Sequence, residues 1–198
     1  MGEADLTARL GRLRAALEAE GLSFDPIVLA GGASADPHGS PSAERRLARG
    51  QPLLVDFGAA WGGYNADITR TFFVGTADAE ARDVYAAVLA ANELGRTIAA
   101  PPMTLDELDR RVTASLHDSG FGDLVLTKTG HGLGLDVHEA PQVMIGNRQA
   151  MEPGMVFTIE PSLMREGHLG VRIEDDVLVS PDGVVSLTGF DRALTLIG

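Results

Sequence analysis

The sequence predicts an α+β fold in which helices alternate with antiparallel hairpins. Long helical patterns occupy residues 78–99 and 104–117, and β-rich runs with Gly- or Pro-containing turns occupy residues 52–74 and 155–180. No Pro/Ser-rich linker divides the 198 residues, of which 44% are hydrophobic and 22% charged, as in proteins that bury a core. We therefore expect one domain that spans residues 1–198.

The N-terminal segment has the pattern of an amphipathic helix. Its leucines recur at spacings of 4, 3 and 4 residues, with arginines and glutamates between them, and so share one helical face: Leu6, Leu10, Leu13 and Leu17. We expect this helix to stop at Gly21, because glycine favours helix C-termini.

A strand, a loop and a hairpin are predicted after the first helix. Residues 26–30 (PIVLA) are apolar and predict a short buried strand, whereas the Gly/Ser/Pro-rich residues 31–42 predict a loop. The apolar run at 52–58 predicts a strand covered on both faces, and residues 64–74 alternate as its partner strand. Glycines between these two strands favour a hairpin over residues 52–74.

Two helices are predicted for the centre of the chain. The first runs from Asp78 to Ala99 and the second from Thr104 to His117, and two consecutive prolines separate them. Thr104 and Glu107 have the spacing of a capping box at the start of the second helix.

The second half of the chain returns to β structure. It begins with a glycine-rich segment at residues 129–141, and a turn at 152–154 leads into a predicted strand over 155–161. A further strand is predicted over 170–180, followed by a hairpin turn at residues 181–183.

Composition excludes several classes of function. The chain has 16 Lys+Arg against 28 Asp+Glu, a net charge of −12, and no cysteine, so any metal must be held by His and carboxylates. Lys128 is the only lysine, and this acidic balance argues against a nucleic-acid partner. No apolar run approaches the roughly 18 residues of a membrane span, and we expect a cytoplasmic protein with no membrane partner.

A faint internal repeat places acids in both predicted hairpins. Asp56 and Asp67 lie 11 residues apart in the first hairpin, and Glu160 and Glu174 lie 14 apart in the second. Ionised carboxylates are costly to bury in apolar strands without a cation. If the two hairpins face one another, the four carboxylates meet at one place.

Histidines supply further candidates. His131 and His138 lie seven residues apart among glycines, which let a metal or substrate approach closely. His38 lies in the loop, where the residues alone favour a solvent-exposed side chain. The H-E-x-x-H zinc motif is absent, because His138 and Glu139 are followed by Ala-Pro, and neither G-x-S-x-G nor G-x-G-x-x-G occurs.

The remaining pattern is an oxygen-rich set of four carboxylates and one imidazole. Such a set suits a pair of divalent ions, with Mn, Co or Fe preferred to a thiolate-type zinc centre. Two adjacent metal ions can activate a water and bind a carbonyl oxygen, so amide hydrolysis is the reaction that this set favours.

Five motifs carry a resemblance to a known family: VDFGA, DITRTF, GHGLGLDVHE, TIEPSL and VRIEDD. From about Gly21 nearly to the C-terminus, the chain resembles the catalytic domain of the pita-bread metallopeptidases, which include methionine aminopeptidase, aminopeptidase P and prolidase. It is most similar to the aminopeptidase P and prolidase branch, the Xaa-Pro peptidases, through FDPIVLAGGASADPHG, YNADITRTFFVG and the pair Arg172 and Glu174. The resemblance implies the pita-bread (creatinase/aminopeptidase) fold, with antiparallel sheets, helices packed outside and pseudo-twofold halves.

The resemblance also implies roles for the acids and one histidine. Asp56 would bind the first metal ion, Asp67 and Glu174 would bridge both ions, and His131 with Glu160 would complete the second site. A bridging hydroxide would attack the scissile carbonyl, with Glu160 as the proton shuttle. The cofactors would be two divalent ions, with manganese expected first and Co, Fe or Zn as alternatives.

The remaining implied roles concern substrate binding. His38 and His138 match the two family histidines that hydrogen-bond the substrate backbone and the developing oxyanion. Arg172 matches an arginine that could orient the bridging Glu174. The substrate would be a small peptide with proline at its second position, and the family allows a homodimer.

One departure and several alternatives accompany the resemblance. Xaa-Pro peptidases normally have an N-terminal domain, and their catalytic domain starts about one helix before Met1, so we expect a catalytic domain without these two parts. The leading hypothesis is a dinuclear metallopeptidase that cleaves the bond between an N-terminal residue and proline. The alternatives are a methionine-aminopeptidase-like activity and a non-catalytic peptide-binding module, and the complete ligand set argues against the module. It also argues against a creatine-type amidinohydrolase.

Overall fold

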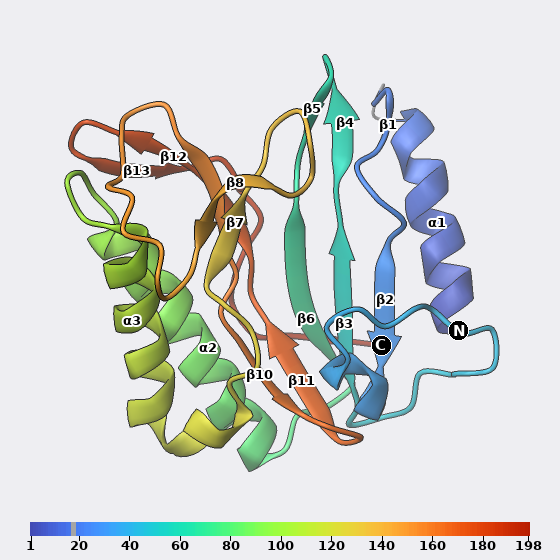
Figure 1. The fold of residues 1–198 in the computed structure, drawn as a ribbon. Coiled ribbons are helices and arrows are strands. Elements are labelled where there is room, and N and C mark those ends of the chain that lie inside the picture. Colours follow the sequence, from blue (N-terminus) through green and yellow to red (C-terminus); the bar gives the residue numbers. More distant parts are fainter. Residues whose placement is uncertain (17–18) are drawn as a thin grey trace.

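The computed structural model describes residues 1–16 and 19–198, with only the backbone for residues 13–16 (Figure 1). Two largely antiparallel sheets lie side by side, with one helix outside the first sheet and two outside the second (Figure 1). These helices are α1 (Glu3–Ala16), α2 (Ala79–Ile98) and α3 (Leu105–Leu116). No helix in the described parts of the chain is long and apolar enough to cross a lipid bilayer. The predicted α+β class, with helices outside antiparallel sheets, is confirmed.

The first sheet has the strand order β14-β6-β3-β2. Its strands are β2 (Ile27–Ala30), β3 (Pro52–Phe57), β6 (Ile68–Val74) and β14 (Thr195–Ile197). β3 and β6 form the predicted antiparallel pair, whereas β14, which has no counterpart in the sequence prediction, lies parallel to β6. A short hairpin between β3 and β6 pairs with a separate N-terminal strand; these strands are β4 (Ala59–Trp61), β5 (Tyr64–Asn65) and β1 (Gly21–Leu22).

The second sheet repeats this plan, with the strand order β13-β12-β9-β7-β8. Its strands are β7 (Gly130–Gly132), β8 (Glu139–Val143), β9 (Val156–Ile159), β12 (Asp175–Ser180) and β13 (Gly183–Ser186). β9 and β12 are antiparallel, and between them in sequence lies the separate hairpin of β10 (Ser162–Arg165) and β11 (Leu169–Arg172). Each half therefore has two central antiparallel strands joined through an inserted hairpin, which confirms the expectation of pseudo-twofold halves.

Two predicted strands are shorter in the structure because the chain leaves each ladder just before β6 and just before β12. At the first break the backbone N–H of Asp67 donates to Asp176 Oδ2 at 3.0 Å. At the second break the N–H of Glu174 donates to Thr69 O at 3.1 Å. Each break thus joins one half of the molecule to the other. The predicted loop at 31–42 also differs, since it begins with a 3-10 turn.

The two central helices form where the sequence predicts them. Asp78 Oδ1 accepts a hydrogen bond from Ala81 N at 2.8 Å, and Thr104 Oγ1 accepts one from Glu107 N at 3.2 Å. Of the two bonds of the predicted capping box, only the one accepted by Thr104 is formed among the described contacts. The Glu107 carboxylate lies instead 3.8 Å from Arg111 Nη1. Both helices start with a side-chain cap that satisfies an otherwise unpaired N–H.

The larger hydrophobic core lies between α2, α3 and the second sheet. Tyr85 and Leu108 from the helices and Phe157 and Ile159 from β9 are almost fully buried in it. On the other side, Leu6 and Leu10 of α1 pack against a small cluster around Val28 of the first sheet, as the leucine spacing predicts. Leu17 and the side chain of Leu13 lie outside the described residues.

A buried aspartate on α3 connects this helix to the β7–β8 hairpin. Asp109 Oδ1 accepts hydrogen bonds from Thr129 N at 2.9 Å and Thr129 Oγ1 at 2.6 Å, and Asp109 Oδ2 accepts one from Ile145 N at 2.7 Å. Thr129 precedes β7 and Ile145 follows β8, so one carboxylate fixes both open ends of the hairpin.

Replacing Asp109 with Ala tests this connection. The substitution leaves three donors in or near the core without an acceptor, so we expect the free energy of unfolding to fall by about 3 kcal/mol. Urea denaturation measures this loss. The exposed Arg111→Ala on the same helix should change it by less than about 0.5 kcal/mol. Equal effects of the two substitutions would contradict the assigned role of Asp109.

Candidate metal centre

Four carboxylates stand at the ends of the central strands of the two sheets. Asp56 lies in β3, Asp67 directly precedes β6, Glu160 directly follows β9 and Glu174 directly precedes β12. In each half the inserted hairpin lies between the two acids in sequence. Because the strands on either side of the hairpin pair antiparallel, both acids of a half lie at the same end of its sheet.

The fold brings the five predicted metal residues together. Asp56, Asp67 and Glu174 each offer an oxygen within 4.8 Å of the others, and His131, Glu160 and Glu174 form a second such group. His131 Nε2 lies 3.4 Å from Glu160 Oε1 and 3.8 Å from Asp67 Oδ2. Two ligand groups therefore share Glu174, which is the arrangement needed for two adjacent ions.

Burial and mutual repulsion disfavour the charged form of these acids in the metal-free protein. Burial, followed by the charge of Asp56, raises the pKa of Asp67 to about 9. Burial raises the pKa of Glu160 to about 7, and burial with the charge of Asp67 raises the pKa of Glu174 well above its usual value. Burial lowers the pKa of His131 to about 4, so its imidazole is neutral near pH 7 and able to bind a metal ion.

Unpartnered oxygens indicate that the residues fit a pair of divalent cations. Three buried carboxylate oxygens accept no hydrogen bond from any residue within 1–16 and 19–198: Asp56 Oδ1, Asp67 Oδ1 and Asp176 Oδ1. Leaving a buried acceptor unsatisfied costs about 1–3 kcal/mol, more for a charged group. Carboxylate oxygens with one imidazole nitrogen are ligands that hard or borderline divalent ions prefer, and such ions would compensate both the repulsion and the missing partners.

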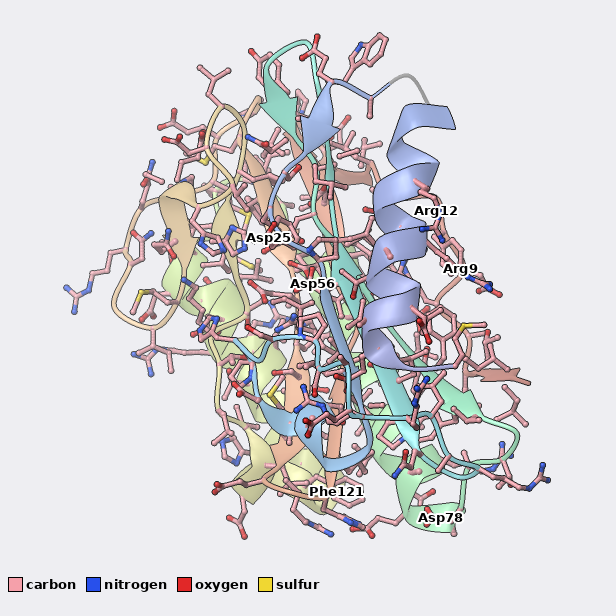
Figure 2. All side chains as sticks on the ribbon, turned by 90° about the vertical axis from the view of Figure 1, so that its right-hand side faces the viewer. Arg9, Arg12, Asp25, Asp56, Asp78 and Phe121 are labelled. Carbon is pink, nitrogen blue, oxygen red and sulfur yellow. The ribbon has the colours of Figure 1, made fainter. Side chains whose placement is uncertain are left out.

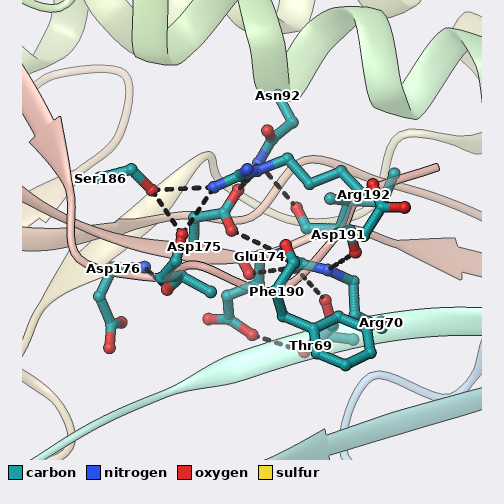
Figure 3. Close-up of polar contacts among 12 residues, drawn as sticks. Thr69, Arg70, Asn92, Glu174, Asp175, Asp176, Ser186, Phe190, Asp191 and Arg192 are labelled. Atoms are coloured by element: carbon teal, nitrogen blue, oxygen red, sulfur yellow. Dashed lines mark hydrogen bonds and ion pairs between the residues drawn. The ribbon is translucent and has the colours of Figure 1, made fainter.

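A neighbouring acid with complete partners gives the contrast. Asp175 Oδ1 lies 2.7 Å from Arg70 Nη2, and its Oδ2 lies 2.7 Å from Arg192 Nε and accepts a hydrogen bond from Asn92 (Figure 3). Arg70 also donates to the backbone carbonyl of Glu174 at 2.6 Å. Asp175 is therefore a structural acid whose charge is already compensated, whereas Asp56 and Asp67 each retain an oxygen without a donor.

Asn92, which the sequence analysis missed, fixes the backbone beside two of the acids. Asn92 lies on α2 and is fully buried. Its Nδ2 donates to Ile159 O at 3.1 Å and Ile173 O at 3.3 Å. These carbonyls belong to the residues directly before Glu160 and Glu174. The signal available in the sequence was a single amide on the apolar face of a strongly amphipathic helix, where an unpaired amide is costly.

Arg172 has a different first partner from the one expected. One of its terminal nitrogens donates to Asp56 Oδ2, and its Nε donates to Thr69 Oγ1 at 3.0 Å. Thr69 Oγ1 in turn donates to Glu174 Oε2, from which Arg172 Nε is separated by 4.0 Å. The guanidinium therefore acts on Glu174 mainly through Thr69, and directly on Asp56.

The candidate site opens into a pocket of about 530 Å³. All five candidate ligands line it, together with His38, His138 and Arg172, so the structure brings every predicted site residue to one pocket. Asp25 and Asp56, labelled in Figure 2, line the pocket from the side of the first sheet. His38 and His138 are exposed on its rim, and the rings of His131 and His138 stack edge to face with centroids 4.1 Å apart.

Comparisons with known proteins show what the chain is similar to. The model of metallopeptidase family M24 matches residues 1–181. The Xaa-Pro dipeptidase of Pyrococcus furiosus is 38% identical over 192 residues, which cover 97% of this chain and 55% of that protein. A putative dipeptidase of Bacillus subtilis is 38% identical over 178 residues, covering 90% of this chain and 49% of that protein. The chain thus spans about half the length of these curated relatives.

Solved structures also match the chain over nearly its full length. The X-Pro aminopeptidase of Thermotoga maritima superposes with a TM-score of 0.96 and 36% identity, covering 100% of this chain and 56% of that one. The prolidase of Pyrococcus furiosus superposes with a TM-score of 0.94 and 37% identity, covering 96% and 56%. An Escherichia coli aminopeptidase P variant in complex with substrate superposes with a TM-score of 0.86 and 26% identity, covering 96% and 49%.

Replacing Asp67 with Asn separates the electrostatic cost of the site from its capacity to bind metal. In EDTA the variant should be at least as stable as the parent, because Asp67 must take up a proton on folding near pH 7, whereas an amide carries no charge in either state. Excess Mn²⁺ should raise the thermal midpoint of the parent but not that of the variant, since binding at a hundredfold excess over Kd contributes about 2.7 kcal/mol. Metal content should fall in parallel, and the exposed Asp182→Asn should behave as the parent. A variant that retains the metal content and midpoint shift of the parent would refute the cluster.

The raised pKa values predict how pH affects the metal-free protein. An acid whose pKa rises on folding stays protonated in the folded state where the unfolded chain is ionised, so stability falls as pH increases. His131, with its lowered pKa, has the opposite effect only below about pH 6.5. Between about pH 6.5 and 8.5 the free energy of unfolding in EDTA should therefore fall, by up to about 1.4 kcal/mol per pH unit for each retained proton.

Urea denaturation at several pH values measures this slope. Asp67→Asn should flatten it, because Asp67 has a pKa of about 9 in the folded protein. A free energy of unfolding that is constant or rises across this window would contradict the assigned repulsion.

Proposed function

The chain belongs to metallopeptidase family M24 and has the pita-bread fold, and we propose that it forms the catalytic domain of a peptidase that cleaves the bond between an N-terminal residue and proline. The observation that carries this proposal is the convergence of two carboxylate-rich ligand groups at the floor of one pocket. The relatives named Xaa-Pro dipeptidase and prolidase support the choice of substrate.

The pocket floor provides the ligands for two metal ions. Asp56 would hold one ion, His131 and Glu160 the other, and Asp67 and Glu174 would contribute ligands to both. When bound, the ions would supply positive charge that activates a water and polarises the scissile carbonyl. We propose manganese as the native metal because oxygen ligands dominate the set.

Glu160 is the acid placed to move protons. Its side chain is the least buried of the carboxylates at the floor, at 13% exposure, and it accepts a hydrogen bond from Thr158 Oγ1 at 3.2 Å. A carboxylate at this position can accept a proton from the attacking water and return it to the leaving proline nitrogen.

Histidines on the rim bind the substrate in this proposal. His38 and His138 both line the pocket and are exposed, so their ring N–H groups can reach a bound peptide. Burial lowers the pKa of His138, which keeps its ring neutral near pH 7 with one N–H to donate to the carbonyl oxygen as charge develops. Arg172 positions Asp56 and, through Thr69, Glu174.

The finer features of the whole protein are proposals of the same kind. We propose a small peptide with proline second as the substrate, a homodimer as the assembly and the cytoplasm as the location. The complete ligand set favours catalysis over a role as a peptide-binding module.

Peptide cleavage tests the proposed function. With Mn²⁺ the protein should hydrolyse Ala-Pro, and EDTA should abolish the reaction. Glu160→Gln should lower kcat by at least about a hundredfold, since general acid–base catalysis contributes 10²–10⁴. The exposed Glu152→Gln serves as the control and should leave kcat unchanged.

Two substrates serve as comparisons for specificity. Ala-Ala tests the requirement for proline, and a Met-initiated peptide without proline tests a methionine-aminopeptidase-like activity. A metal-loaded protein that leaves every peptide with proline second intact would overturn the proposal, and so would one that cleaves the comparison peptides equally well.

A further inference from the structure

The pocket has a basic rim above its floor of candidate metal ligands. Three exposed side chains that line the pocket form this rim: His38, Lys128 and His138. Lys128 is the only lysine of the chain, and it supplies the ammonium group that a ligand on the floor meets at the rim.

Lys128 is the cation that the proposed mechanism does not use. Arg172, the other cationic side chain that lines the pocket, is buried and paired with Asp56. Lys128 has no carboxylate oxygen within 4.0 Å among the residues that the structure describes; its Nζ donates to the side-chain oxygen of Gln142. An ammonium group has three donors, so donors remain for a ligand.

The backbone around Lys128 is held in place. The next residue, Thr129, is clamped through both its N–H and its hydroxyl by Asp109. Gln142 is also oriented, because its Nε2 donates to Glu139 O at 3.0 Å, which leaves its oxygen for the lysine. The lysine is therefore held from α3, through the backbone of its neighbour Thr129, and from β8, through Gln142.

We propose that Lys128 binds the terminal carboxylate of the substrate, so that the chain selects Xaa-Pro dipeptides over longer peptides. The inference rests on the proposed function and specifies its substrate class. In an Xaa-Pro dipeptide the free carboxylate is two bonds beyond the nitrogen of the scissile amide, so it lies beside the floor where that bond is cleaved. A longer peptide has an uncharged amide at this place and gains no ion pair from Lys128.

Lys128 also favours one direction of the substrate. Its ammonium group attracts the carboxylate of a dipeptide and repels the ammonium group at the other end. The reverse orientation would bring two positive charges together, so it is disfavoured. The exposed Asp25, which also lines the pocket, offers the ammonium group of the substrate an opposite charge.

Steady-state kinetics on Ala-Pro and its C-terminal amide, Ala-Pro-NH₂, test the inference in the Mn²⁺-loaded protein. The parent should prefer the acid to the amide by about tenfold in kcat/KM, the contribution of one charge-assisted hydrogen bond. Lys128→Met should lose this preference through a higher KM for Ala-Pro, with the amide changed less than about twofold. Lys128→Arg should retain most of it, and the exposed Arg148→Met controls for the loss of one positive charge.

A binding measurement separates this inference from the proposed function. Calorimetry with a reduced-bond Ala-Pro analogue, which cannot be cleaved, and with its C-terminal amide measures carboxylate recognition without turnover. Tighter binding of the acid in the parent, lost in Lys128→Met, supports the inference even if no peptide is hydrolysed. Equal affinity for acid and amide, or equal loss of both in Lys128→Met, overturns the inference while leaving Xaa-Pro cleavage intact.

Discussion

The fold depends on holding four mutually repelling carboxylates at one buried place. Burial and neighbouring charges raise the pKa of Asp67 to about 9 and that of Glu174 well above its usual value. Hydrogen bonds to every oxygen would relieve this cost but would also block the ligand positions. The chain instead fixes the backbone around the acids, through Asn92, Thr69 and Asp176, and leaves oxygens of Asp56 and Asp67 without donors.

Charge compensation distinguishes Asp175 from the acids on either side of it. Asp175 is surrounded by arginines and an amide, so its charge is balanced inside the protein. Asp176 accepts the N–H of Asp67 through Oδ2 and thereby orients the backbone of a candidate ligand, while its Oδ1 is buried without a donor in the described residues. Alternation places Asp175 on the face opposite to Glu174 and Asp176, because successive side chains of an extended chain point to opposite faces.

Short-range patterns in the sequence predict most of the elements, the internal repeat singles out the four acids, and the family resemblance selects His131 as the fifth candidate ligand. Asp56 and Glu160 are recognisable because an acid in an apolar strand needs a partner, and Asp78 and Thr104 because caps precede helices. The strand breaks before β6 and β12 are not predictable in this way. They arise from bonds between residues more than 100 positions apart, such as Glu174 N to Thr69 O. The pairing of Arg172 with Asp56, 116 positions away, likewise depends on tertiary contacts.

Pseudo-symmetry explains how the candidate metal site forms but not how the pocket selects its substrate. Each half supplies two acids from equivalent strand ends. These four acids alone would line the pocket with carboxyl groups only. The second half also contributes residues 128–138, a segment that carries none of these four acids. This segment supplies Lys128, His131 and His138 to the pocket. Asp109 of α3 fixes the start of this segment, whereas His38 reaches the rim from the loop of the first half. Within the described residues, the first half contributes no lysine or arginine to the pocket lining. The departure from symmetry therefore places the ammonium group of Lys128 at the rim, and a substrate with a free carboxylate is the ligand that matches it.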